Sequence, residues 1–252
     1  GVASVTSKNA FIAYRLLTAL FGAETIEVPE HDFRFDLDAL LAAITPETRV
    51  VFIANPNNPT GTLVGQEEID RFMERVPQEV VVVFDEAYNE YLNDAPDTLR
   101  FVRQGRNVIV LRTFSKIHGL ASMRLGYGIA HPELIRVLQK TREPFNTNGV
   151  VQAGAVASLA DAEHQRATKQ LTDEGRAYLE SEFAAMKLRY VPSVANFVLV
   201  HVGDGKAVFE KLLKKGVIVR ALKGYKLPEW IRISVGTMAQ NRKCIAALRE
   251  VL

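Results

Sequence analysis

The sequence predicts an α/β protein with a mostly parallel sheet that carries helices on both faces, followed by a smaller α+β domain at the C-terminus. Two continuous apolar runs, residues 50–54 and 80–84, are rich in β-branched side chains, as in strands that are buried on both faces. Strand patterns alternate with helical patterns over residues 1–150, which is typical of parallel strands joined by helical crossovers. A long helical pattern then precedes a second group of strands and helices.

The elements expected in the first part follow from local patterns. The chain opens on a strand over residues 2–6, and a helix over 9–20 has apolar residues at helical spacing with Gly22 as a stop. Asp36 is a favourable cap for a helix over 36–44. The remaining elements expected here are strands at 25–28 and 107–111 and helices at 66–75 and 132–141.

The second part is predicted to be a compact α+β domain. One helix is expected over 151–187, and helices of this length commonly bridge domains, with their charged residues on a solvated face. The elements expected after it are strands at 196–201, 217–220 and 230–235 and helices at 205–214 and 240–251. We therefore expect a large domain over 1–150, a connecting helix over 151–187 and a small α+β domain over 188–252.

The composition argues against several classes of protein. The chain has 252 residues, of which 48% are hydrophobic and 24% charged, as in ordinary globular proteins. The net charge is +2 with both signs interspersed, so nothing indicates a nucleic-acid or membrane partner. Cys244 is the only cysteine, which excludes an internal disulfide and favours a cytoplasmic location. No apolar run approaches membrane-spanning length, and no metal site is expected.

Residues 111–116, Leu-Arg-Thr-Phe-Ser-Lys, place Lys116 on a loop after an apolar strand. A lysine amine can form a Schiff base with an aldehyde. The hydroxyls of Thr113 and Ser115, and the guanidinium of Arg124 eight residues past the lysine, fit a dianionic phosphate. This combination describes pyridoxal phosphate. The alternative is that Lys116 is an exposed loop lysine, as most lysines are.

Two further stretches lie at the ends of predicted strands. The strand over 80–84 ends in Asp85-Glu86-Ala87-Tyr88, and a carboxylate at the tip of a parallel strand lies where ligands bind in open α/β sheets. Asp85 could pair with the protonated ring nitrogen of the cofactor, and Tyr88 could reach its phenolic oxygen. The strand over 50–54 ends in Asn-Pro-Asn-Asn-Pro-Thr-Gly, a rigid turn that presents the amide of Asn58.

The ordered motifs NPNNPTG, DEAY and RTFSK, with GLASMRLGYG behind them, resemble those of fold-type I pyridoxal-phosphate aminotransferases. The similarity is greatest to the histidinol-phosphate aminotransferase group, and it continues through REPFNTN, PSVANFVLV and WIRISVGT over nearly the whole chain. The resemblance implies that residues 1–150 are the large domain that binds pyridoxal phosphate.

The resemblance also implies a role for each matched residue. Lys116 is implied to be the Schiff-base lysine, Asp85 the partner of the pyridinium nitrogen, and Tyr88 the third catalytic residue. The implied cofactor-binding residues are Asn58, Asp85, Tyr88, Thr113, Ser115, Lys116 and Arg124.

Arg232 lies in the middle of an apolar strand, and a half-buried arginine needs an anion. The residues alone leave a structural salt bridge as the alternative. The resemblance implies that Arg232 binds the α-carboxylate of the substrate, and that for histidinol phosphate, which has no carboxylate, the phosphate lies near Arg232 and Arg220. It further implies a small-molecule amino donor, a keto-acid acceptor and a homodimer.

Three features depart from the family pattern. Relatives carry an N-terminal portion before the opening strand, so the resemblance implies a shortened chain that binds its cofactor more weakly. An aromatic residue usually stacks on the cofactor ring near the start of the 9–20 helix; our alignment places Asn9 there, with Phe11 or Tyr14 as alternatives. His118 stands where an aromatic or small residue is usual, and we interpret it as a solvated loop histidine.

Three functions compete at this point. The first is an aminotransferase that moves an amino group between an amino acid, or an amino-alcohol phosphate like histidinol phosphate, and 2-oxoglutarate through a Schiff base on Lys116. The second is aromatic amino acid transamination or decarboxylation on the same scaffold, because a scaffold does not fix a reaction. The third is a shortened or engineered pyridoxal-phosphate-binding domain with little activity.

Overall fold

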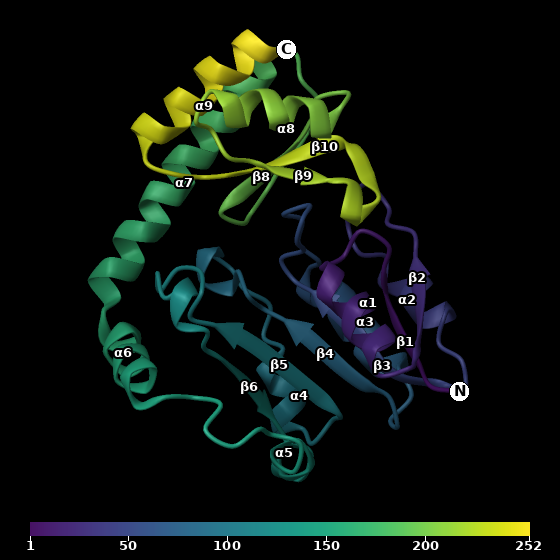
Figure 1. Ribbon diagram of the computed structural model, residues 1–252. Coiled ribbons are helices and arrows are strands. Elements are labelled where there is room, and N and C mark those ends of the chain that lie inside the picture. The colour runs from purple at the N-terminus through teal and green to yellow at the C-terminus, as the bar shows by residue number, and fades with distance from the viewer.

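The computed structural model describes all 252 residues and contains two β-sheets (Figure 1). The larger sheet has six strands in the order β2-β1-β3-β4-β5-β6, and the smaller has four in the order β7-β8-β10-β9. Strands β1 to β5 are parallel to their neighbours, while β6 is antiparallel to β5. The smaller sheet is antiparallel throughout. The predicted fold class, a mostly parallel sheet with helices and a smaller α+β part, is confirmed.

Strands and helices alternate along the first part of the chain as far as β5, and each predicted element of this part is present. They are β1 (Ala3–Ser7), α1 (Ile12–Leu20), β2 (Glu24–Val28), α2 (Leu37–Ala42), β3 (Thr48–Ala54), α3 (Gln66–Arg75), β4 (Val81–Asp85), α4 (Leu99–Arg103), β5 (Val108–Thr113), β6 (Gly126–Ala130) and α5 (Pro132–Gln139). Of these elements, helix α4 and strand β6 were not predicted. Glycine is disfavoured in strands, but Gly126 is needed beside β5, where an added Cβ would lie 2.9 Å from the carbonyl oxygen of Arg112.

Helices cover both faces of the larger sheet. Phe52 of β3 stacks on Tyr14 of α1, with ring centroids 4.7 Å apart, and Phe84 of β4 stacks on Phe101 of α4 at 6.5 Å. Phe84 pairs in register with Ile53, the neighbour of Phe52. Since successive residues of a strand point to opposite faces, the two phenylalanines lie on opposite faces. Helices α1 and α4 therefore sandwich the sheet.

The second part of the chain forms the smaller sheet and its covering helices. Its elements are α6 (Gly149–Ala160), α7 (Ala162–Ala185), β7 (Tyr190–Val191), β8 (Phe197–His201), α8 (Gly205–Lys214), β9 (Arg220–Leu222), β10 (Leu227–Ser234) and α9 (Met238–Val251). Figure 1 shows α7 rising from α6 to the smaller sheet, where it joins α8 and α9. Leu179 and Phe183 of α7 are fully buried in the core of this part. None of the helices is long and apolar enough to cross a membrane.

The prediction of one helix over 151–187 is wrong, because the helix breaks at Asp161. This residue has ψ 72°, outside the helical range, and it ends α6 while it caps α7. Its Oδ1 accepts a hydrogen bond from the backbone N–H of His164 at 2.9 Å. Aspartate is among the best N-caps, so a new helix can start at this point within an otherwise helical pattern. The domain boundaries at residues 150 and 187 remain predictions.

We predict that Gly175→Ala destabilises the fold. Gly175 lies where α7 packs on α9, and an added Cβ would lie 2.5 Å from Val235 Cγ1 and 2.6 Å from Asn241 Nδ2. Overpacking of this kind costs about 1–3 kcal/mol, which exceeds the gain of about 1 kcal/mol from replacing a helical glycine. Gly154→Ala in α6 is the matched control, because a Cβ there meets nothing within 4 Å. The free energies of unfolding come from denaturant titrations, and equal stability of the two variants would contradict the close packing of α7.

Candidate active site

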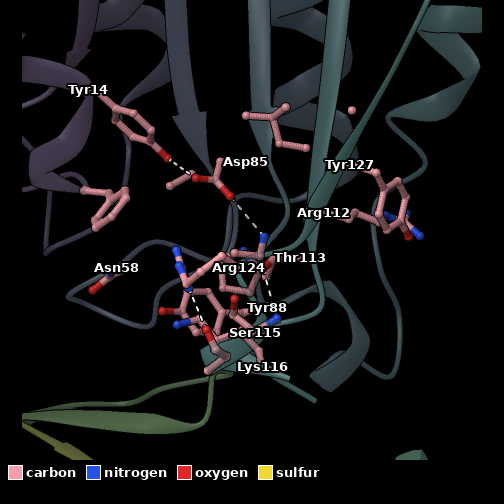
Figure 2. Close-up of a pocket in the computed structure, with 18 residues that line it drawn as sticks. Tyr14, Asn58, Asp85, Tyr88, Arg112, Thr113, Ser115, Lys116, Arg124 and Tyr127 are labelled. Carbon is pink, nitrogen blue, oxygen red and sulfur yellow. Dashed lines mark hydrogen bonds between the residues drawn. The ribbon is translucent and has the colours of Figure 1, made fainter. Parts of the chain in front are cut away.

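The carboxyl ends of β3, β4 and β5 lie at one edge of the larger sheet, because these strands are parallel neighbours. Their ends carry the 55–61 turn, Asp85 and the turn that contains Lys116. Together they line a cleft of about 620 Å³ (Figure 2). The structure brings together in this cleft all the residues that the sequence predicted to hold the cofactor: Asn58, Asp85, Tyr88, Thr113, Ser115, Lys116 and Arg124.

Asp85 is held by two donors. Its Oδ2 accepts from the hydroxyl of Tyr14 at 2.6 Å, and its Oδ1 accepts from the N–H of Ala87 at 3.1 Å (Figure 2). Burial raises the pKa of Asp85, while these hydrogen bonds and the charge of Lys116 lower it. The sequence reasoning missed Tyr14 as a partner of Asp85. The sequence signal that could have found it is a tyrosine within an amphipathic helix. A buried phenol usually has a hydrogen-bond partner, so a partner for Tyr14 could have been expected.

Lys116 is half-buried, and its Nζ lies 5.3 Å from the centroid of the Tyr88 ring. Burial lowers the pKa of Lys116, and the positive charges of Arg232 and Arg124 lower it further, against the opposing effect of Asp85. A lysine with a lowered pKa has more free amine at neutral pH, which favours attack on a carbonyl carbon. Burial raises the pKa of Tyr88, so its phenol stays protonated as a hydrogen-bond donor.

The turn after β5 presents hydroxyls and a guanidinium to the same cleft. Thr113 Oγ1 accepts from the N–H of Ser115 at 3.0 Å, which tightens the turn. Arg124 adopts a left-handed backbone conformation with φ 57°, and its Nη1 donates to the carbonyl oxygen of Ala121 at 2.7 Å. Its guanidinium is exposed at the cleft. These groups are donors that suit an anion such as phosphate.

Arg232, on the smaller sheet, contacts a residue that lines the cleft. It lies on β10, and its Nη1 donates to Oδ1 of Asn58. Its guanidinium lies 4.8 Å from the ring centroid of Phe197, and its Nε is buried without a partner. Arg232 forms no salt bridge, so the alternative of a structural ion pair is wrong. A half-buried cation with an unused donor can bind an anionic ligand.

Arg220 does not line the cleft, but it lies beside Arg232. The two arginines pair in register across β9 and β10, and paired residues of antiparallel strands share a face. Arg220 is exposed and forms no salt bridge. Like charges directly opposite each other repel, so an anion bound between them would relieve this repulsion.

Two sequence interpretations need correction. Asn9 does not line the cleft; its Nδ2 donates to the carbonyl oxygen of Tyr225 at 2.7 Å. Phe11 lies in the cleft instead, edge to face with Tyr14 at 5.7 Å. His118 is not a solvated loop residue, because it is only 6% exposed and its Nδ1 lies 2.8 Å from Ser158 Oγ.

The second carboxylate of the DEAY motif has a structural partner. Glu86 Oε2 accepts from both Nε and Nη2 of Arg112, at 3.0 and 2.9 Å, and Glu86 is 2% exposed. Thr98 also donates to this carboxylate. Glu86 is therefore neutralised outside the cleft, and Asp85 is the carboxylate of the motif that lines the cleft.

The chain is similar to known aminotransferases in sequence and in structure. A family model described as "Aminotransferase class I and II" matches residues 5–248. The chain is 56% identical to the histidinol-phosphate aminotransferase of Akkermansia muciniphila, over 98% of this chain and 69% of that protein. It is 48% identical to histidinol-phosphate aminotransferase 2 of Ralstonia nicotianae, over 100% of this chain and 69% of the relative.

A solved structure gives the same result. The histidinol-phosphate aminotransferase of Sinorhizobium meliloti, determined in complex with pyridoxal-5'-phosphate, superposes with a TM-score of 0.91 at 32% identity. The match covers 100% of this chain and 70% of that one. The resemblance predicted from the motifs is confirmed. The chain belongs to the class I and II aminotransferases, a family of pyridoxal-phosphate-dependent enzymes.

Proposed function

We propose that this chain transfers an amino group between an amino-alcohol phosphate of the histidinol-phosphate type and 2-oxoglutarate, with pyridoxal phosphate as cofactor. The observation that carries the proposal is the cleft itself. It holds Lys116, whose pKa is lowered, and Asp85, whose pKa is raised by burial, and its lining residue Asn58 accepts a hydrogen bond from Arg232, which forms no salt bridge. The names of the relatives support histidinol phosphate as the amino donor.

The donors of the cleft fit pyridoxal phosphate. When bound, this cofactor supplies an electron sink for the electrons released at the substrate Cα. Asp85, whose pKa is raised by burial, gains a compensating charge from a protonated ring nitrogen. Phe11 offers an aromatic face for the ring. The remaining contacts proposed are the phenolic oxygen with Asn58 and Tyr88, and the phosphate with Thr113, Ser115 and Arg124.

Lys116 is proposed to have two roles. Its amine would hold the cofactor covalently at the aldehyde carbon, with the aldehyde oxygen lost as water. As a free amine, Lys116 would act as the general base that accepts the proton from the substrate Cα. Both roles need the uncharged amine, and the lowered pKa of Lys116 supplies it.

Arg232 and Arg220 are proposed to bind the anionic ends of both substrates. Arg232 is fixed by Asn58 and Phe197, so it presents its guanidinium in one orientation. A guanidinium binds phosphate and carboxylate oxygens with the same planar donors. The same pair therefore serves the phosphate of the amino donor and a carboxylate of 2-oxoglutarate.

We also propose that the chain forms a homodimer. Helix α1 and the residue after it expose four large apolar side chains, Leu16, Leu17, Leu20 and Phe21, each at least 50% accessible. A contiguous apolar surface of this kind marks an interface, and a two-fold dimer is the commonest closed assembly. The cytoplasmic location expected from the single cysteine stays a prediction.

Lys116 is predicted to carry the cofactor. Borohydride reduction of the holoprotein should attach the cofactor to the peptide that contains Lys116, and Lys116→Ala should lose both this label and transamination. Lys140→Ala is the control, because Lys140 is an exposed lysine at the end of α5. A label on another lysine, read by peptide mass spectrometry, would rule out the assignment.

Asp85→Asn is predicted to keep the fold and to lower kcat by about 10- to 100-fold. A neutral amide no longer keeps the ring nitrogen protonated, and a charge-assisted hydrogen bond contributes about 1.5–3 kcal/mol. Asp94→Asn, at an exposed position, should leave kcat unchanged. Steady-state kinetics and circular dichroism test this together; wild-type turnover in Asp85→Asn would exclude the proposed role.

Arg220→Gln is predicted to raise KM roughly tenfold for a phosphate-bearing amino donor, the equivalent of about 1.4 kcal/mol of lost binding. KM for an amino donor without phosphate should change much less. Arg242→Gln, an exposed arginine of α9, is the matched control. Equal KM changes for both donors would contradict a phosphate site at Arg220. They would favour the alternative hypothesis, that the chain transaminates aromatic amino acids.

A further inference from the structure

Two histidines join the turn of Lys116 to the break between α6 and α7. His118 Nδ1 lies 2.8 Å from Ser158 Oγ, near the end of α6. His164 Nε2, in the first turn of α7, lies 3.1 Å from the carbonyl oxygen of Ile117. Ile117 and His118 directly follow the lysine, so both contacts act on its own turn.

The chemistry of each contact is defined by its atoms. A carbonyl oxygen only accepts, so His164 Nε2 carries the hydrogen that bonds to Ile117. This carbonyl accepts no hydrogen bond from the backbone, so His164 is its donor. The ring of His118 packs 5.0 Å from that of Phe114, and burial lowers the pKa of His118. The groups that face His118 are Ser158 from α6, His164 from α7 and Phe114 from its own turn.

The same turn also touches the second part of the chain. The Ile117 side chain is 2% exposed and packs in one cluster with Tyr88 and with Phe197 of β8. Helix α7, which begins at this contact, carries Leu179 and Phe183 into the core beneath the smaller sheet. The lysine turn is therefore held from both sides by elements that belong to the smaller sheet and its helices.

We propose that His118 and His164 are positioning residues that fasten the Lys116 turn to the break between α6 and α7, and so keep the lysine amine facing Asp85 and Arg232. This inference rests on the proposed role of Lys116. When the two histidines hold the turn, the Lys116 amine lies near two cationic groups, Arg232 and Arg124, and is half-buried. A turn released from the break gives the amine more water and more distance from both arginines.

The test measures the titration of Lys116 in the apoprotein. Lysines are acetylated competitively with acetic anhydride over a range of pH, and mass spectrometry gives the midpoint for the Lys116 peptide. Ser158→Ala should raise this midpoint by up to about one pH unit, the equivalent of one hydrogen bond. Alanine favours helix, so this variant is expected to fold. Ser181→Ala, which removes an exposed serine hydroxyl from α7, is the matched control and should not move the midpoint.

Further variants separate positioning from a general loss of stability. His118→Phe keeps a ring against Phe114 but loses the bond to Ser158, and should give the same rise as Ser158→Ala. The double variant should add nothing, because both changes remove one contact. His164→Gln keeps an amide donor for Ile117 and should behave as wild type, whereas His164→Leu should raise the midpoint.

The outcomes are distinguishable from those of the proposed function. Wild-type midpoints in Ser158→Ala and His118→Phe, or fully additive shifts in the double variant, would overturn the positioning role. The proposed function has its own readout, since a borohydride label on a lysine other than Lys116 would reject it. The acetylation midpoint is measured without cofactor and does not depend on that result.

Discussion

A carboxylate buried at the tip of a central strand is costly unless donors or cations surround it. Asp85 holds this position at the end of β4, and the cleft is arranged around it. Tyr14 comes from α1, the N–H of Ala87 from the next loop and Lys116 from the turn after β5. The need of the Asp85 carboxylate for donors and cations thus holds three separate segments against the sheet. Glu86, one residue on, is satisfied by Arg112 and takes no part in the cleft.

Most of the fold could be predicted because its signals are local. The strands β3 and β4 appear as β-branched apolar runs, and the start of α2 is marked by the capping aspartate Asp36, whose Oδ1 accepts from Ala39 N–H at 2.9 Å. The break at Asp161 could not be predicted, because no glycine or proline stands near it and aspartate also occurs inside helices. Strand β6 was missed for the opposite reason, since its glycines indicate a turn until their closeness to β5 is known.

The predictable part of the site is the part that sits at strand ends. Asn58, Asp85 and Lys116 each follow an apolar strand directly, so their convergence needs only the parallel order of β3, β4 and β5. The contact of Arg232 with Asn58 depends instead on how the smaller sheet is placed over the larger one. Asn9 was misplaced because two residues of offset at a helix start decide which side chain enters the cleft.

The contact between Asn58 and Arg232 spans 174 residues of the chain, and that between Asn9 and Tyr225 spans 216. Contacts so distant in sequence form late, and parts of a chain made on the ribosome fold from the N-terminal side first. Strands β1 to β5 can therefore form before β10 has been synthesised. The growing chain therefore acquires the cleft at the strand ends well before the strand that carries Arg232.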